Sequence, residues 1–255
     1  MRAVTFDVAA ERYDQFMGRF SRLLAPQMAD LAGLVAGQRA IDVGSGPGAL
    51  TSELVRRLGA DHVAAVDPSA PFVAAAAERH PGVDVRRASA EALPFPDAAF
   101  DAALAQLVVH FMADPVAGLR EMARVTAPGG VVVACVWDHA GGTGPLGLFW
   151  STAHELDPAI VDESDLAGAR EGHLAELFAA AGLRELEATS LAADLEMATF
   201  EAWWAPFTQG AGPAGAYVGS LDATRRDALR DRCHAALGSE PFTIVARAWA
   251  VRGTV

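Results

Sequence analysis

A buried strand that runs into a glycine-rich turn and then a helix constrains the fold of this chain more than any other feature. Residues 40–48 have the sequence AIDVGSGPG, and the helical pattern LTSELVRRL follows at 50–58. Glycine lets a backbone turn sharply and approach a ligand closely, and the helix that follows presents free N–H groups. The spacing Gly44-x-Gly46-x-x-Ala49 also satisfies the dinucleotide-binding fingerprint. The turn therefore predicts a nucleotide-type ligand, although a tight turn that holds no ligand has the same sequence.

Strand-like and helical patterns alternate across residues 38–137. Short strand-like runs lie at 39–43, 62–66, 83–87, 100–105 and 131–137. Alternation of this kind indicates βαβ units and a parallel sheet. We therefore expect an α/β fold with a parallel sheet.

The two flanking regions complete the predicted domain, a single unit over residues 1–255. Residues 1–37 have helix-like spacing of apolar side chains, with a break expected near Pro26, and form an N-terminal cap on the core at 38–137. Residues 138–255 form a helical cover on the acceptor side and the last two strands. We expect helices at 173–182 and 220–237, helix with breaks at 146–170, and strands at 183–197 and 242–251.

Composition excludes several chemistries. All 20 basic residues are arginine, and the chain contains neither lysine nor asparagine, which is typical of a GC-rich and therefore bacterial genome. The absence of these two residues excludes a Schiff-base lysine, a Walker A lysine and any metal site that needs an asparagine ligand. Two cysteines cannot build a disulfide framework or a four-cysteine zinc site. We expect no metal.

Charge and hydropathy patterning limit the kinds of partner that the chain can bind. The net charge is −12 and the arginines are dispersed, so the chain lacks the basic face that nucleic-acid binding requires. The N-terminal segment is amphipathic and holds acidic residues, unlike a signal peptide, and no apolar run reaches membrane-spanning length. We expect a cytoplasmic protein that binds neither nucleic acid nor membrane. Its oligomeric state is left open.

Two acidic residues at predicted strand ends limit which ligands the glycine turn can bind. Asp67 ends the second strand, where a carboxylate can accept hydrogen bonds from both hydroxyls of a ribose, as NAD and adenosyl ligands require. Asp42 lies two residues before Gly44, where a carboxylate would repel a pyrophosphate but suits a ligand with an ammonium and a sulfonium centre. Charge therefore favours S-adenosylmethionine over NAD. A purely structural role for Asp42, holding the turn, is compatible with the same ligand.

The stretch 38–137 closely resembles the class I S-adenosylmethionine-dependent methyltransferases, particularly the subgroup that acts on small molecules. Four motifs match that family in order: AIDVGSGPG, AAVDPS (64–69), ASAEALPFPDAAFD (88–101) and LREMARVTAPGG (119–130). The segment YDQFMGRFSR (13–22) also resembles a helix that covers the ligand in one branch of the family. The resemblance implies a Rossmann-like, doubly wound sheet of seven strands, mostly parallel with an antiparallel last strand. It also implies S-adenosyl-L-methionine as cofactor and a small-molecule acceptor.

The resemblance also assigns roles to residues. The backbone of the glycine turn is expected to pack on the methionine part, Asp67 to hold the ribose, and the segment after the third strand to surround the adenine. The cofactor-binding residues it implies are Tyr13, Met17, Arg19, Asp42, Gly44, Ser45, Gly46, Gly48, Asp67, Pro68, Ser89, Ala90, Glu91 and Gln106. Ser89 stands where the family usually has an acid. For Tyr13 and Met17, ordinary helix packing is an alternative to ligand contact.

Methyl transfer is an in-line displacement, so the protein mainly aligns the reactants, excludes water and, for some acceptors, supplies a base. His110 follows the fourth strand and His139 follows the fifth, which makes them the candidate bases, with packing or capping as the alternative role for His110. The metal-dependent catechol type is excluded, because its Asp-Asp-Asn site needs an asparagine. Aromatic residues that could choose the acceptor, or simply pack in the core, are Trp137, Phe149, Trp150, Trp203, Trp204 and Phe207.

Three functions stay open at this stage. A small-molecule methyltransferase accounts for all the motifs. A fold relative that binds S-adenosylmethionine without methylating would have the same cofactor residues. An NAD-dependent oxidoreductase would share the glycine turn, but the usual tyrosine–lysine catalytic pair is impossible without lysine.

Overall fold

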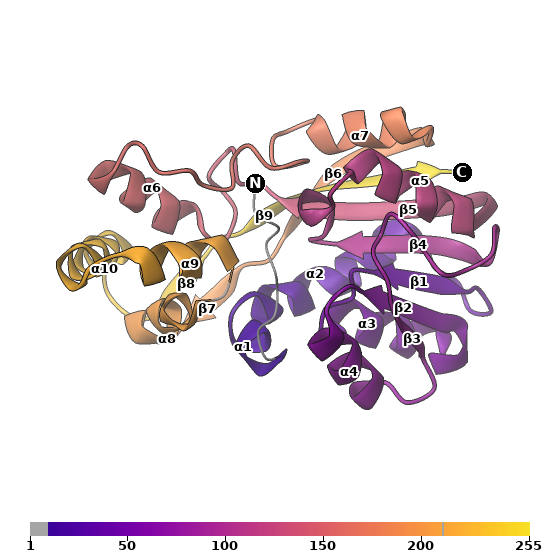
Figure 1. The fold of residues 1–255 in the computed structure, drawn as a ribbon, viewed down its shortest axis with the longest axis horizontal. Coiled ribbons are helices and arrows are strands. Elements are labelled where there is room, and N and C mark those ends of the chain that lie inside the picture. The colour runs from indigo at the N-terminus through magenta and orange to yellow at the C-terminus, as the bar shows by residue number, and fades with distance from the viewer. Residues whose placement is uncertain (1–9, 211) are drawn as a thin grey trace.

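A seven-stranded sheet forms the centre of the molecule in the computed structural model, which describes residues 10–210 and 212–255 (Figure 1). From one edge to the other the strands are β3 (Asp84–Arg87), β2 (Val63–Asp67), β1 (Ala40–Val43), β4 (Phe100–Gln106), β5 (Thr126–Trp137), β9 (Arg247–Thr254) and β6 (Arg184–Ala192). The pairs from β3 to β5 are parallel, and β9 is antiparallel to both of its neighbours. The predicted fold class is confirmed.

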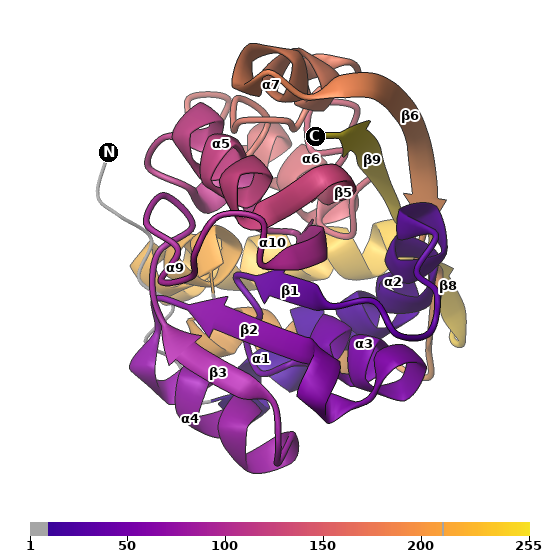
Figure 2. The same ribbon diagram turned by 90° about the vertical axis from the view of Figure 1, so that its right-hand side faces the viewer.

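Helices cover both faces of this sheet because each central strand is apolar on both sides. Along β5, Val131, Val133 and Cys135 face one core, and Val132 and Ala134 face the other. The first core includes α2 (Met17–Ala32) and α3 (Ala49–Leu58), and the second includes α5 (Pro115–Val125) and α7 (His173–Ala181). Helix α4 (Ala70–Arg79) packs beside β2 and β3 (Figure 2).

Local signals set several helix ends. Helix α5 begins at Pro115 after Asp114, whose side chain accepts a hydrogen bond from the Ala117 N–H, an arrangement expected of a helix N-cap. Helix α7 ends at Gly182, which adopts the left-handed conformation. Helix α10 (Ala223–Leu237) begins after the capping residue Asp222. The predicted helices at 173–182 and 220–237 are thus confirmed. Short 3₁₀ turns, η1 (Ala60–His62) and η2 (Val109–Phe111), precede β2 and follow β4.

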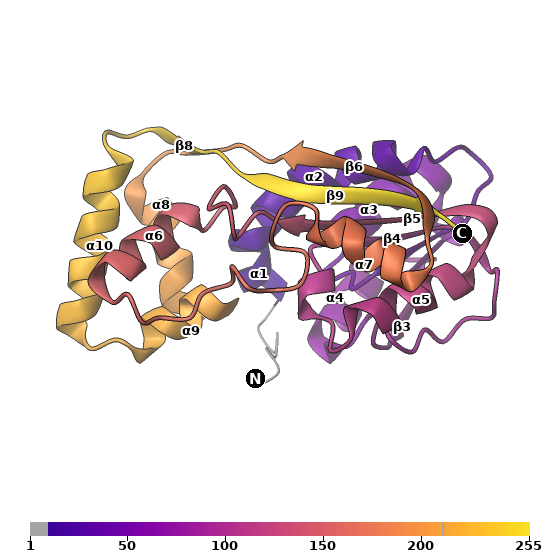
Figure 3. The ribbon, with the colours of Figure 1, turned by 90° about the horizontal axis from the view of Figure 1, so that it is seen from above.

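A cover lies beyond the carboxyl ends of the parallel strands (Figures 1 and 3). It contains α1 (Ala10–Gln15), α6 (Gly147–Leu156), β7 (Leu195–Met197), α8 (Phe200–Trp204), η3 (Ala205–Gln209), α9 (Gly212–Ser220), α10 and β8 (Phe242–Ile244). Strands β7 and β8 pair antiparallel in a small second sheet. The two last strands predicted from the sequence are therefore each split between two sheets.

The split occurs where the side chain of Asp194 interrupts the ladder. One of its oxygens accepts hydrogen bonds from the Ala246 backbone N–H at 3.3 Å and from Arg247 Nη1 at 2.7 Å. Beyond this point the chain leaves the large sheet and continues into the cover. Figure 3 shows β6 leading toward the cover and β9 returning from it.

Two other expectations are wrong. The N-terminal helix does not break at Pro26, because α2 continues through it. A proline inside a helix costs about 3 kcal/mol, and here the burial of Leu24, Ala25, Met28 and Ala29 against the sheet outweighs that cost. In the segment 146–170 only α6 is α-helical.

Among the described residues, no helix is both long and apolar enough to cross a membrane.

The two neighbouring leucines of α2 provide a test of this packing. Leu24 is completely buried, whereas Leu23 is 39% exposed. We expect Leu24→Ala to lower the free energy of unfolding by about 2–5 kcal/mol, because it leaves a cavity, and Leu23→Ala to change it by less than about 1 kcal/mol. Urea unfolding of both variants measures this, and equal losses would contradict the described orientation of α2.

Candidate active site

The glycine turn lies at the carboxyl end of β1, between β2 and β4, where ligands bind in open α/β sheets. Gly44, Gly46 and Gly48 have positive φ angles of 73°, 53° and 100°. A Cβ atom on Gly44 would lie 2.4 Å from Val108 Cγ2, so no side chain fits there. A Cβ atom on Gly46 would meet nothing within 4 Å. The turn is therefore packed on the Val108 side and open at Gly46, where a ligand can approach the backbone.

Asp67, the last residue of β2, holds this turn in place. Its Oδ2 accepts a hydrogen bond from the Gly46 N–H at 2.9 Å, and its Oδ1 accepts one from the Ser69 N–H at 2.8 Å. Burial raises the pKa of the Asp67 carboxyl, and these two N–H groups act in the opposite direction. Each carboxylate oxygen can accept a second hydrogen bond. Asp67 thus joins two βα turns and still has acceptor capacity for a ligand.

Asp42 lies on β1, the strand that pairs with β2, and is completely buried. Its Oδ2 accepts a hydrogen bond from Thr51 Oγ1 at 2.6 Å, which ties the first turn of α3 to β1, while Oδ1 has no partner among the described residues. Burial raises the pKa of this carboxyl to about 7, and the nearby Asp67 charge adds to the effect. Asp42 does not line the cavity described next, so it can influence a ligand only through the field of its charge.

A cavity of about 480 Å³ opens at the ends of β1, β2 and β4. This volume lies within the range of small-molecule sites. The predicted cofactor residues that line it are Tyr13, Gly44, Gly46, Asp67, Pro68, Ser89, Ala90, Glu91 and Gln106. The predicted residues Met17, Arg19, Asp42, Ser45 and Gly48 do not line it. Lining residues that the sequence analysis missed include Phe72, Arg87, Phe111 and Met112, of which Arg87 ends a strand and could have been found from that position.

Two polar side chains in the cavity wall are already engaged with the protein. Glu91 Oε1 accepts hydrogen bonds from the backbone N–H groups of Ala113 at 2.8 Å and Asp114 at 3.3 Å. Gln106 Nε2 donates to the Ser21 carbonyl at 2.9 Å, whereas its buried Oε1 has no partner in the described structure. Glu91 therefore orders the loop before α5, and Gln106 connects α2 to the end of β4.

A smaller pocket of about 50 Å³ adjoins this cavity and shares Tyr13, Leu107 and Phe111 with it. It contains both candidate bases, whose ring centroids are 5.8 Å apart. Nδ1 of His110 and Nε2 of His139 are buried and have no hydrogen-bond partner among the described residues. We call this space the histidine pocket.

Both imidazoles in the histidine pocket are held neutral. Burial lowers the pKa of His110 well below its usual value, and the neighbouring His139 acts in the same direction. Burial lowers the pKa of His139 to about 4, although the charges of Asp162 and Asp138 oppose the shift. The same pocket holds the carboxyl of Glu163, a residue that the sequence analysis missed. No sequence signal marks Glu163, because it lies in the irregular segment between α6 and α7.

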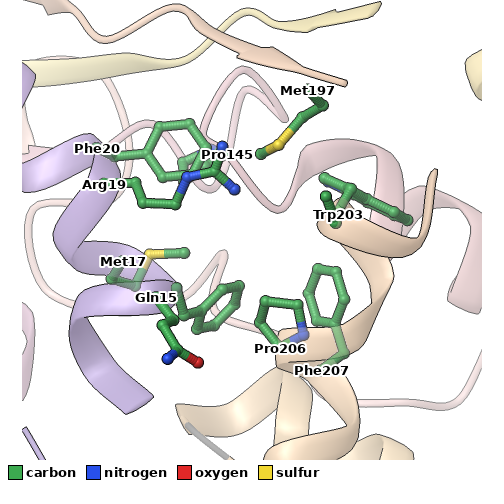
Figure 4. Close-up of a pocket in the computed structure, with 11 residues that line it drawn as sticks. Gln15, Met17, Arg19, Phe20, Pro145, Met197, Trp203, Pro206 and Phe207 are labelled. Atoms are coloured by element: carbon green, nitrogen blue, oxygen red, sulfur yellow. The ribbon is translucent and has the colours of Figure 1, made fainter. Parts of the chain in front are cut away.

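Arg19 and Met17 lie in a third, very small pocket between α2 and the α8–η3 segment (Figure 4). Arg19 points into this space, which Phe20, Trp203 and Phe207 help to line. Met17 also reaches the histidine pocket.

The six predicted acceptor-side aromatics are all buried, and most of them pack on one another. Trp137 lines the histidine pocket, and Trp203 and Phe207 line the third pocket. Phe149 stacks on Phe207 with ring centroids 4.6 Å apart. Phe149, Trp150 and Trp204 line none of the three pockets, so core packing accounts for them.

Comparisons with known proteins show what this chain is similar to. Residues 41–134 match the family model described as a methyltransferase domain. Over 131 residues the chain is 37% identical to malonyl-[acyl-carrier protein] O-methyltransferase of Erwinia billingiae, covering 51% of each chain. Over 145 residues it is 37% identical to demethylmenaquinone methyltransferase of Renibacterium salmoninarum, covering 54% of this chain and 59% of that one. The chain therefore spans little more than half the length of the curated relatives it matches.

A solved structure shares the fold across almost the whole chain. A putative methyltransferase from an antibiotic biosynthesis pathway of Anabaena variabilis superposes with a TM-score of 0.61 at 18% identity, covering 92% of this chain and 99% of that one.

The raised pKa of Asp42 has a consequence for stability. Because its folded-state pKa of about 7 lies well above the ordinary value of an aspartate carboxyl, the stabilisation by the protonated form is complete at low pH and is lost as the pH rises through 7. We expect the free energy of unfolding of the ligand-free protein to fall between about pH 5 and pH 8, by on the order of 3 kcal/mol from Asp42 alone. Asp42→Asn should flatten this dependence in urea unfolding.

Part of the slope should remain in that variant, because the pKa values of Asp67 and Glu163 are also raised. Asp61→Asn, at a site whose side chain is 84% exposed, serves as the control and should leave the slope unchanged. A slope in Asp42→Asn as steep as in the parent protein would contradict the assignment.

Proposed function

We propose that this chain, whose residues 41–134 form a class I S-adenosylmethionine-dependent methyltransferase domain, transfers the methyl group of S-adenosylmethionine to a small-molecule acceptor. The observation that carries the proposal is the position of Asp67. Its carboxylate lies in the wall of the 480 Å³ cavity, where it accepts a hydrogen bond from the Gly46 N–H of the glycine turn. The histidine pocket adjoins that cavity.

The cavity residues suit the cofactor. Asp67 can accept hydrogen bonds from the two ribose hydroxyls, because each of its oxygens has acceptor capacity left after the backbone bonds. Ser89 and Ala90 would lie along the adenine, and the open backbone at Gly46 would face the methionine part. The buried Oε1 of Gln106 can accept a hydrogen bond from the ammonium group. The bound cofactor supplies an electrophilic methyl group on a sulfonium centre.

Charge supports this ligand over a dinucleotide. Asp42 and Asp67 lie at the ends of neighbouring strands beside the turn, and the whole chain has a net charge of −12. A pyrophosphate next to these carboxylates would be repelled, whereas a cation compensates the cost of burying them. The same field favours the sulfonium form of the cofactor over the neutral thioether that remains after transfer.

In this proposal the methyl acceptor binds in the histidine pocket. A methyl acceptor there would meet the cofactor cavity at Tyr13, Leu107 and Phe111. His110 and His139 are neutral imidazoles with unpartnered nitrogens, so each can orient an acceptor by a hydrogen bond. The names of the two relatives specify malonyl-acyl carrier protein and demethylmenaquinone as acceptors. The matches cover little more than half of each relative, so neither acceptor is assigned to this chain.

The alternative function, a fold relative that binds the cofactor without methylating, shares every cofactor residue named above. The unpartnered imidazoles beside the cavity favour catalysis, since buried polar atoms without partners are costly unless a ligand uses them. Turnover of labelled S-adenosylmethionine against a panel of phenols, amines and carboxylic acids separates the two functions.

Cofactor binding can be measured without knowing the acceptor. In calorimetric titration we expect the parent chain to bind S-adenosylmethionine but not NAD. Asp67→Asn should weaken S-adenosylmethionine binding at least about tenfold, because hydrogen bonds from the ribose hydroxyls to a charged acceptor are lost.

Asp84→Asn, on the neighbouring strand β3 and outside the cavity, is the matched control and should bind like the parent. Thermal unfolding shows whether each variant is folded. Binding of NAD in place of S-adenosylmethionine, or undiminished binding by Asp67→Asn, would refute the proposal.

A further inference from the structure

The carboxyl of Glu163 lies in the histidine pocket, and none of the cofactor roles described above uses it. The side chain is 4% exposed, and its Oε2 accepts a hydrogen bond from Trp150 Nε1 at 2.9 Å. Within residues 10–210 and 212–255, Oε2 is the only atom of this carboxyl that takes part in a hydrogen bond. The indole therefore fixes one oxygen of this carboxyl and leaves the other available to a molecule in the pocket.

The charge of the pocket determines which acceptors it can take. Of the described residues that line it, Glu163 is the only acid, and no arginine lines it. Lysine is absent from the chain, and both imidazoles are neutral. An acceptor carboxylate would be buried beside another carboxyl with no cationic side chain in the pocket to compensate it, which is unfavourable. The pocket therefore disfavours anionic acceptors and suits a neutral group that can donate a hydrogen bond.

The walls of the pocket indicate the body of the acceptor. Phe16, Met17 and Leu146 supply apolar surface, while His110, His139 and Glu163 supply polar side chains beside the Tyr13 hydroxyl and the Trp137 indole. This distribution suits a flat apolar molecule with a single polar group directed at these three residues.

Glu163 is also the group in the pocket best suited to receive a proton near neutral pH. Burial raises the pKa of its carboxyl to about 7, with a smaller contribution from the Asp162 charge and an opposing one from the Trp150 hydrogen bond. The imidazole of His139, with a pKa of about 4, binds a proton far less readily. Two other titratable groups, His110 and Tyr13, line the same pocket, and Asp162 is the neighbour of Glu163 in sequence. The Asp162 carboxylate is hydrogen-bonded to His154 Nε2 at 2.9 Å and to the Ser164 hydroxyl.

We propose that Glu163 recognises the hydroxyl of a phenol or enol acceptor and accepts its proton during methyl transfer. The inference rests on the proposed function. As the acceptor oxygen bonds to the methyl carbon, the carbon–sulfur bond breaks and its electron pair stays on sulfur. The hydroxyl proton passes to the Glu163 carboxylate, which becomes a carboxylic acid and later releases that proton to solvent. His110 and His139 orient the hydroxyl oxygen.

Three probes of matched shape test the recognition: 4-methylphenol, 4-methylaniline and 4-methylbenzoate. Binding is measured by calorimetry with the full chain saturated with S-adenosylhomocysteine, so that no turnover occurs. We expect 4-methylphenol to bind at least about tenfold more tightly than 4-methylbenzoate, and more tightly than 4-methylaniline. Its affinity should rise between about pH 6 and pH 8, because ionised Glu163 is the stronger hydrogen-bond acceptor.

Glu163→Gln should weaken 4-methylphenol binding about tenfold and abolish this pH dependence. The pH dependence of methyl transfer to 4-methylphenol from labelled S-adenosylmethionine should be lost in the same variant. Glu171→Gln, at an exposed site of the same irregular segment, is the control and should behave like the parent chain. Trp150→Phe removes the hydrogen bond to Glu163 but keeps the carboxyl, so it should retain the preference for the phenol.

The outcomes separate the two proposals. Failure to bind S-adenosylhomocysteine would overturn the proposed function itself. Binding of S-adenosylhomocysteine together with no preference for 4-methylphenol, or with an unchanged pH profile in Glu163→Gln, would overturn only the role of Glu163. Tighter binding of 4-methylaniline would overturn the hydroxyl assignment and indicate an amine acceptor.

Discussion

The carboxylate of Asp67 is the interaction on which the geometry of the site depends. It accepts one N–H from the turn after β1 and another from the turn after β2, so two segments that are distant in sequence share one anchor. The turn at Gly44 and Gly46 adopts a left-handed conformation and packs against Val108. Gly44 and Gly46 line the cavity, and α3 begins directly after the turn, so both depend on its position.

The site divides into two electrostatic environments. On the cofactor side, the buried carboxyls of Asp42 and Asp67 resist ionisation in the absence of a cation, which is why their pKa values are raised. On the acceptor side, apolar walls keep the two imidazoles neutral and leave Glu163 as the only acid that lines the described pocket. A cationic cofactor and a neutral acceptor are the pair of ligands that this division best accommodates.

The sequence patterns predicted those parts of the fold that are determined by residues close together in the chain. The glycine turn could be predicted from the residues around Gly44, and His110 and His139 follow adjacent strands, which explains why the structure brings them together. The continuation of α2 through Pro26 could not be predicted, because tertiary burial decides it. Glu163 was missed for a similar reason, since an irregular segment without periodicity carries it into the pocket. The division of residues 1–255 into cap, core and cover, and the cofactor roles of individual side chains, stay predictions.

A crystal structure of the chain with S-adenosylhomocysteine tests the central claim most directly. We predict that the ribose hydroxyls lie within hydrogen-bond distance of Asp67, that the adenine lies beside Ser89 and Ala90, and that the sulfur is directed toward the pocket of His110 and Glu163. Electron density for the ligand elsewhere on the chain, or in the cavity with its sulfur directed away from the histidine pocket, would contradict it.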